Sequence, residues 1–136
     1  MHDEEIWDKI TSSLRVGKIL PLLYMRKGAQ KFRIYRIKDN NIRIQFMESK
    51  NLFTLLDSRF ISAYRILEEN KGDWVEISAS KDEPDEWTIE GRIKLDYNGK
   101  LNSTATATWI CPILEYVFDN IDFNKENTGQ ALRMTK

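Results

Sequence analysis

The sequence predicts an α+β domain in which a three-stranded antiparallel β-meander packs against a helical C-terminal half. Its 136 residues, 41% apolar and 31% charged, are typical of one globular domain. Segments 31–38 and 42–48 alternate apolar and polar residues around a short polar turn, which predicts a hairpin. Segment 103–123 carries the strongest helical stripe, with apolar residues at three- and four-residue spacing: Ile110, Ile113, Leu114, Val117 and Phe118.

The first half of the chain predicts one helix and the meander, which spans residues 18–48. We expect a helix over Asp3–Arg15, capped by Asp3 and closed by Gly17. Segment 18–25 is strand-like, and Pro21 places it at a sheet edge or a bulge because proline has no N–H to donate. Alternation assigns two faces to the hairpin. The core face holds Phe32, Ile34, Ile42, Ile44 and Phe46, and the outer face holds Arg33, Tyr35, Arg43 and Gln45.

The second half predicts mainly helices, over residues 57–123. Segment 51–56 reads as a connection or a short helix, and a helix capped by Asp57 or Ser58 runs to residue 70. Segments 73–79 and 121–123 predict short strands. Segment 87–97 fits a strand or a helix, and we favour a helix capped by Thr88 or by the acidic residues before it. Two interpretations of 104–118 are open. We favour one helix with a kink at Pro112, which costs about 3 kcal/mol if nothing compensates for it. The alternative is a strand followed by a helix that begins at Pro112.

Composition narrows the classes of function. One cysteine, Cys111, and one histidine, His2, leave no intramolecular disulfide and no thiol- or imidazole-rich metal site. Glycine-rich phosphate loops are absent from the sequence, so we expect no nucleotide cofactor. No run approaches the roughly 20 apolar residues that span a bilayer, and the first residues are acidic where a signal peptide is basic. We therefore expect a cytoplasmic protein without a membrane partner. Residues 1–124 are expected to form the domain, and 125–136 a flexible tail.

The formal net charge is zero, but the charges are segregated along the chain. Nine basic residues and no acidic residue lie between Lys9 and Lys38, whereas nine acidic and two basic residues lie between Glu68 and Glu90. Such asymmetry is typical of a surface that binds a polyanion. It is equally typical of two segments that pack together and neutralise each other.

The basic residues of the hairpin predict a nucleic-acid interface. Arginine pairs with phosphate, and tyrosine stacks on an unpaired base. An outer sheet face that carries both residue types is therefore the candidate surface for DNA or RNA, unless the acidic segment covers it. The candidate binding residues are Arg26, Lys27, Lys31, Arg33, Tyr35 and Arg43.

The predicted order of elements from residue 57 to 123 is helix, strand, helix, helix, strand. This order resembles that of a winged helix, in which the third helix enters the DNA major groove. The resemblance covers about half of the chain and implies that 104–118 is the groove-reading helix. That helix offers hydroxyl groups but no lysine or arginine, so it lacks the cations that phosphate contacts require.

Two further functions remain open. The charged segments also fit a protein-interaction or self-association module, to which the four tryptophans could contribute an exposed surface. Asp85, Glu90 and Lys94 loosely resemble the residues of metal-dependent nucleases. Their spacing lacks the acid-x-lysine tripeptide, because Arg92 stands where lysine should be. Cys111 lies in an apolar stretch without a histidine nearby, so we expect a packed thiol rather than a nucleophile. The sequence favours a non-enzymatic module.

Overall fold

The computed structural model describes residues 1–23, 31–77, 86–99, 106–124 and 131–136. The strands form two antiparallel sheets, one ordered β1-β2-β3-β4 and the other ordered β5-β7-β6. With its four helices among the described residues, the fold class is α+β, as the sequence predicts. In chain order the elements are α1 (Asp3–Ser13), β1 (Ile19–Pro21), β2 (Lys31–Ile37), β3 (Asn41–Phe46), β4 (Leu52–Leu56), α2 (Asp57–Glu69), β5 (Val75–Glu76), α3 (Ile89–Asn98), α4 (Ala107–Val117), β6 (Ile121–Phe123) and β7 (Ala131–Met134).

The first sheet has four strands, so the expected three-stranded meander is wrong by one strand. Residues 52–56, which we expected to form a connection or a short helix, pair with β3 as β4. Their run of apolar residues is too short for periodicity to distinguish a strand from a helix. β1 occupies only the start of the predicted 18–25 strand. It pairs with β2 at the edge of the sheet, where Pro21 is tolerated.

A β-bulge in β2 changes the outer face of this sheet. Phe32 lies opposite Phe46 and Ile34 lies opposite Ile44, but the register shifts between Ile34 and Arg36. Tyr35 is the extra residue, and beyond it Arg36 lies opposite Arg43. The predicted core face is confirmed for Phe32, Ile34, Ile42 and Ile44, which are all buried, whereas Phe46 is partly exposed.

The helices begin and end at identifiable residues. The N-cap of α1 is His2 rather than Asp3, and the N-cap of α2 is Leu56 rather than Asp57 or Ser58. Thr88 caps α3 as predicted, because its hydroxyl accepts the N–H of Gly91 at 3.0 Å. α3 ends at Gly99 in the left-handed conformation (φ 73°), which glycine adopts without strain. Segment 87–97 is therefore mainly helical.

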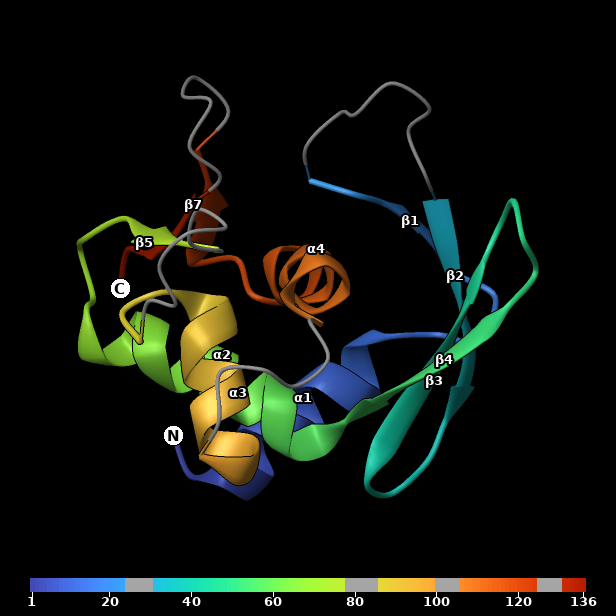
Figure 1. Cartoon of the computed structure of the whole chain (residues 1–136), viewed down its shortest axis with the longest axis horizontal. Helices are drawn as coiled ribbons and strands as arrows, with labels where there is room; N and C mark the ends of the chain where they lie inside the picture. The colour runs from blue at the N-terminus through green and yellow to red at the C-terminus, as the bar shows by residue number, and fades with distance from the viewer. Residues whose placement is uncertain (24–30, 78–85, 100–105, 125–130) are drawn as a thin grey trace.

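Helix α4 is the centre of the hydrophobic core. Figure 1 shows it between the β1–β4 sheet and the other helices. Its predicted stripe is buried, and Pro112 lies inside it. The ring of Trp109 lies 5.2 Å from the rings of both Phe46 and Phe53, which attaches α4 to the inner face of the sheet. Residues 104 and 105, the expected start of this helix, lie outside the described residues.

The second sheet joins three short strands, of which β7 was not expected. Residues 131–134 belong to the segment that we predicted to be a flexible tail, yet β7 pairs with both β5 and β6. Ala131, Leu132 and Met134 are buried, and this apolar surface fixes the strand in the core. None of the described helices is long and apolar enough to cross a membrane.

Candidate nucleic-acid interface

The predicted interface residues that the structure describes lie on two neighbouring strands. Lys31, Arg33 and Tyr35 belong to β2, and Arg43 belongs to β3. Arg33 lies opposite Gln45, so Arg33 and Arg43 share the outer face with it. Arg26 and Lys27 lie outside the described residues. The structure therefore brings Arg33, Tyr35 and Arg43 together, with Lys31 at the start of the same strand.

The bulge adds a residue that the sequence analysis missed. Strict alternation from Phe32 places Arg36 on the core side, but the bulge at Tyr35 turns Arg36 to the outer face, directly opposite Arg43. The sequence contains a sign of this shift, because the apolar positions 32 and 34 are followed by Ile37 rather than by an apolar residue at 36. A bulge produces such a break in the alternation, but the break alone does not locate the bulge.

The arginines surround one aromatic ring. The guanidinium carbons of Arg33 and Arg36 each lie 6.0 Å from the centre of the Tyr35 ring, at the limit of a cation–π contact. The Nε of Arg33 also donates to the side-chain oxygen of Gln45 at 2.8 Å, which fixes the direction of that side chain. We call Arg33, Tyr35, Arg36 and Arg43 the arginine face.

Arg43 has an unsatisfied donor. Its Nε is buried, and it has no hydrogen-bond partner among the described residues. Arg36, the residue opposite, is also a cation, so the two guanidinium groups repel each other across the strands. Buried donors in native proteins almost always have an acceptor. An anionic oxygen bound at this face would supply the acceptor that the described residues do not.

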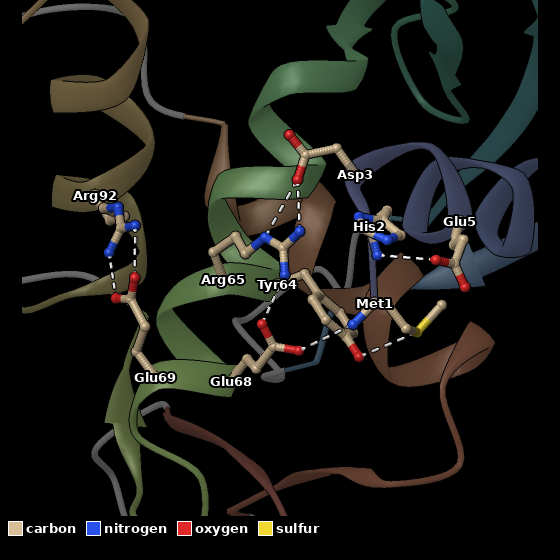
Figure 2. Close-up of polar contacts among 9 residues, drawn as sticks. All are labelled: Met1, His2, Asp3, Glu5, Tyr64, Arg65, Glu68, Glu69 and Arg92. Carbon is tan, nitrogen blue, oxygen red and sulfur yellow. Dashed lines mark hydrogen bonds and ion pairs between the residues drawn. The ribbon is translucent and has the colours of Figure 1, made fainter.

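The ion pairs between described residues lie away from the arginine face. Figure 2 shows Arg65 of α2 between Asp3 of α1, at 2.6 Å, and Glu68, at 2.7 Å. Arg92 of α3 reaches Glu69 of α2 at 2.6 Å, and this pairing lowers the pKa of Glu69. The other pairs involve the terminal amino group, Asp96, Asp122 and Arg133. None of these pairs includes Lys31, Arg33, Arg36 or Arg43.

The described part of the acidic segment is on the helical side of the molecule. Glu68 and Glu69 end α2, and Glu76 belongs to β5. Figure 1 shows that α2 starts beside the β1–β4 sheet and runs away from it, so its C-terminal end and β5 lie on the far side of the molecule from the sheet. Glu90 is 7% exposed and accepts the N–H of Ala107 at 3.1 Å, so it caps α4 from within the core. These carboxylates therefore do not neutralise the arginine face. Residues 78–85 lie outside the described residues.

The described start of α4 is mostly turned toward the rest of the molecule. In the segment that the winged-helix resemblance implies to be the groove-reading helix, Thr106 is 2% exposed, Trp109 packs against the first sheet, and Thr108 is half-buried. Asn102, Ser103 and Thr104 lie outside the described residues. A groove-reading helix must present its first turns to DNA. In the described part of these turns, the N–H of Ala107 donates to Glu90 of α3, and Trp109 packs against Phe46 and Phe53 of the sheet.

Of the candidate nuclease residues, the structure describes only Glu90 and Lys94, both in α3. Glu90 is committed to the N-terminus of α4, and Asp85 lies outside the described residues. Within the described ranges, no three acidic, histidine or cysteine side chains are grouped to hold a metal ion. Cys111 is buried, and burial raises the pKa of its thiol far above the ordinary value. A thiol in this state is a poor nucleophile.

A shallow cleft lies on the helical side, around β5. Its volume is about 370 Å³, and its lining includes Asp73, Trp74, Glu76 and Trp87. Trp74 is 41% exposed and Trp87 is 74% exposed, although large aromatic side chains are normally buried. Asp73 and Glu76 give this cleft negative charge, whereas the arginine face is positively charged.

Three comparisons with known proteins gave no match. No protein-family model matches the chain, and neither the curated proteins nor the solved structures include a significant match.

Proposed function

We propose that the protein is a small non-enzymatic module that binds nucleic acid on the arginine face of its first sheet. The observation that carries the proposal is the pair Arg36 and Arg43, which lie directly opposite each other with no ion pair to a described carboxylate. Two cations in such positions destabilise a sheet unless an anion lies between them. A phosphate group has the charge and the acceptor oxygens to do so.

Single-stranded nucleic acid fits this surface better than a duplex. Tyr35 offers an aromatic ring between two arginines, and unpaired bases stack on such rings whereas paired bases are not accessible. A sheet face with cations around an aromatic residue can bind the backbone and one base together. The described helices, by contrast, offer no cationic stripe that could enter a major groove.

The second part of the proposal concerns structure: we propose that the helical half is winged-helix-like. From α2 to β7 its order is helix, strand, helix, helix, strand, strand, and the last strand pairs between the other two. In this proposal the third helix, α4, packs on the first sheet and has lost the groove-reading role. The binding surface would then have moved to the sheet.

The proposal is tested by fluorescence anisotropy with labelled single-stranded and double-stranded oligonucleotides at two salt concentrations. We expect tighter binding of the single strand, with an affinity that falls steeply as salt rises. The Arg33→Ala/Arg43→Ala variant should reduce the salt slope by about 1 for each lost phosphate contact. Lys71→Ala/Lys136→Ala removes the same charge elsewhere and serves as the control. Absence of binding by the unaltered protein at low salt would reject the proposal.

The cleft around β5 favours a second candidate, a protein-interaction module that binds basic peptides. The guanidinium carbon of Arg133 already lies 4.3 Å from the centre of the Trp74 ring, so this part of the surface holds a cation within the chain itself. Asp73 and Glu76 add negative charge to the same cleft, which attracts lysine or arginine side chains. Titration with a lysine-rich peptide should change tryptophan fluorescence, and Glu76→Gln should weaken the binding. An equal response to a glutamate-rich peptide would contradict this candidate.

A further inference from the structure

Strand β4 is an edge of the first sheet. It pairs with β3 on one side, and no described strand pairs with its other side. The N–H of Asp57 donates to the carbonyl of Asn40, and the N–H of Phe46 donates to the carbonyl of Asn51. Because hydrogen-bonded pairs alternate along an antiparallel ladder, both main-chain groups of Leu52 and Thr54 must point away from β3, and so must the N–H of Leu56. The carbonyl of Leu56 belongs to the first turn of α2, because Leu56 is the N-cap of that helix.

The edge at β4 lacks the features that normally prevent strands from pairing between molecules. Its sequence Leu52–Leu56 contains no charged residue, proline or glycine. The opposite edge, β1, is only 3 residues long and contains Pro21. Natural sheets protect their edges with charge, proline or short length. Only one of the two edges of this sheet is protected in this way.

The strand is complementary to itself in the antiparallel direction. With Thr54 opposite Thr54 of a second copy, the two residues can exchange both of their outward main-chain hydrogen bonds. The same register places Leu52 opposite Leu56 on the outer face and Phe53 opposite Leu55 on the inner face. All cross-strand neighbours are then apolar pairs or a threonine pair, which stabilise antiparallel sheets. No like charges meet in this register.

We propose that the protein forms a two-fold symmetric dimer in which β4 pairs with β4 of a second copy and the two first sheets become continuous. A second copy is the partner that this strand fits, because one register satisfies both edges identically. Thr54 is the neighbour of Arg43 across the β3–β4 ladder, so the dimer places two arginine faces on one surface. The dimer itself does not depend on nucleic-acid binding.

The test is sedimentation equilibrium of the protein without nucleic acid, over a wide concentration range. We expect a species of twice the 16.1 kDa chain mass. Thr54→Lys places two like charges at the two-fold axis and should weaken dimerisation about tenfold or more. Thr54→Pro removes only an outward N–H and should have the same effect without breaking a bond to β3.

Two control variants keep the test specific to this edge. Thr54→Val retains the strand and its N–H, and Ile19→Lys adds charge to the opposite edge; both should remain dimeric. Circular dichroism verifies that each variant is folded. A monomer at every concentration would overturn the proposal, and so would a dimer that persists in both Thr54→Lys and Thr54→Pro. Either result would leave the nucleic-acid proposal unaffected, because its test measures oligonucleotide affinity.

Discussion

Arg36 and Arg43 face each other across β2 and β3, and this arrangement has a measurable consequence for stability. Arg36→Thr removes one of two like charges from an exposed position and introduces a residue that favours strands. We expect the free energy of unfolding to rise by about 0.5 kcal/mol at low salt, and by less at high salt. Urea denaturation at two salt concentrations measures this change. A less stable variant would mean that Arg36 has a structural role.

Glu90 gives the fold a defined pH dependence. Burial raises the pKa of Glu90, although the N–H of Ala107 and the nearby cations Lys94 and Arg59 oppose this effect. The folded protein therefore holds this proton more tightly than the unfolded chain does. The stabilising contribution of Glu90 is complete below its ordinary pKa of 4.5 and is lost as the pH rises through the raised value.

The Glu90→Gln variant tests this sign. Glutamine keeps the shape and an oxygen that can accept the Ala107 N–H, but it does not titrate. The difference in the free energy of unfolding, variant minus unaltered protein, should grow in favour of the variant as the pH rises from below 4.5 through the raised pKa of Glu90. Chemical denaturation of both proteins across this range measures the difference. A constant difference would show that the carboxylate is solvated.

At the scale of elements, α1 holds the β2–β3 hairpin in place. The Nε1 of Trp7 donates to the carbonyl of Asp39 in the hairpin turn at 2.7 Å, while its ring packs against Phe60 at 5.7 Å. Trp7→Phe retains an aromatic ring but loses the hydrogen bond, and we expect it to destabilise the fold by about 1 kcal/mol.

Amide hydrogen exchange measures the local effect of this substitution. The N–H of Lys38, which donates to the carbonyl of Asn41 within the turn, should exchange faster in Trp7→Phe. The amides of β7, far along the chain, should change only as much as global stability does. Unchanged exchange at Lys38 would contradict the role of α1 in fixing the hairpin.

Most elements could be predicted from the sequence because their local patterns agree with their tertiary contacts. The stripe of α4, the Thr88 cap of α3 and the alternation of β2 and β3 are examples. β4 could not be predicted, since its apolar run has no period that excludes a helix. β7 could not be predicted either, because its burial depends on pairing with β5, more than fifty residues earlier.

The arginine face was predicted only in part, for a related reason. Arg33 and Arg43 follow from alternation, but Arg36 reaches the outer face only through the bulge at Tyr35. A bulge depends on how two strands are paired, and the sequence of one strand alone does not determine that pairing. One member of the Arg36–Arg43 pair therefore lies on a face where strict alternation from Phe32 would not place it.

At the scale of the whole molecule, the described parts of the two charged segments do not pair with each other. The described acids that form ion pairs meet Arg65, Arg92, Arg133 or the terminal amino group, while the sheet that carries the arginine face lies on the other side of α4 (Figure 1). Within the described ranges, the arginine face is therefore a local cationic surface on a chain of zero net charge. Such a surface attracts anionic ligands at long range.

The arginine face is tested most directly by the salt dependence of single-stranded oligonucleotide binding by Arg36→Ala/Arg43→Ala. We expect weaker binding and a salt slope that is smaller by about 2 than that of the unaltered protein, because two phosphate contacts are lost. The control Lys71→Ala/Lys136→Ala should keep the original slope. An equal slope for both variants would contradict the claim that the arginine face is the binding surface.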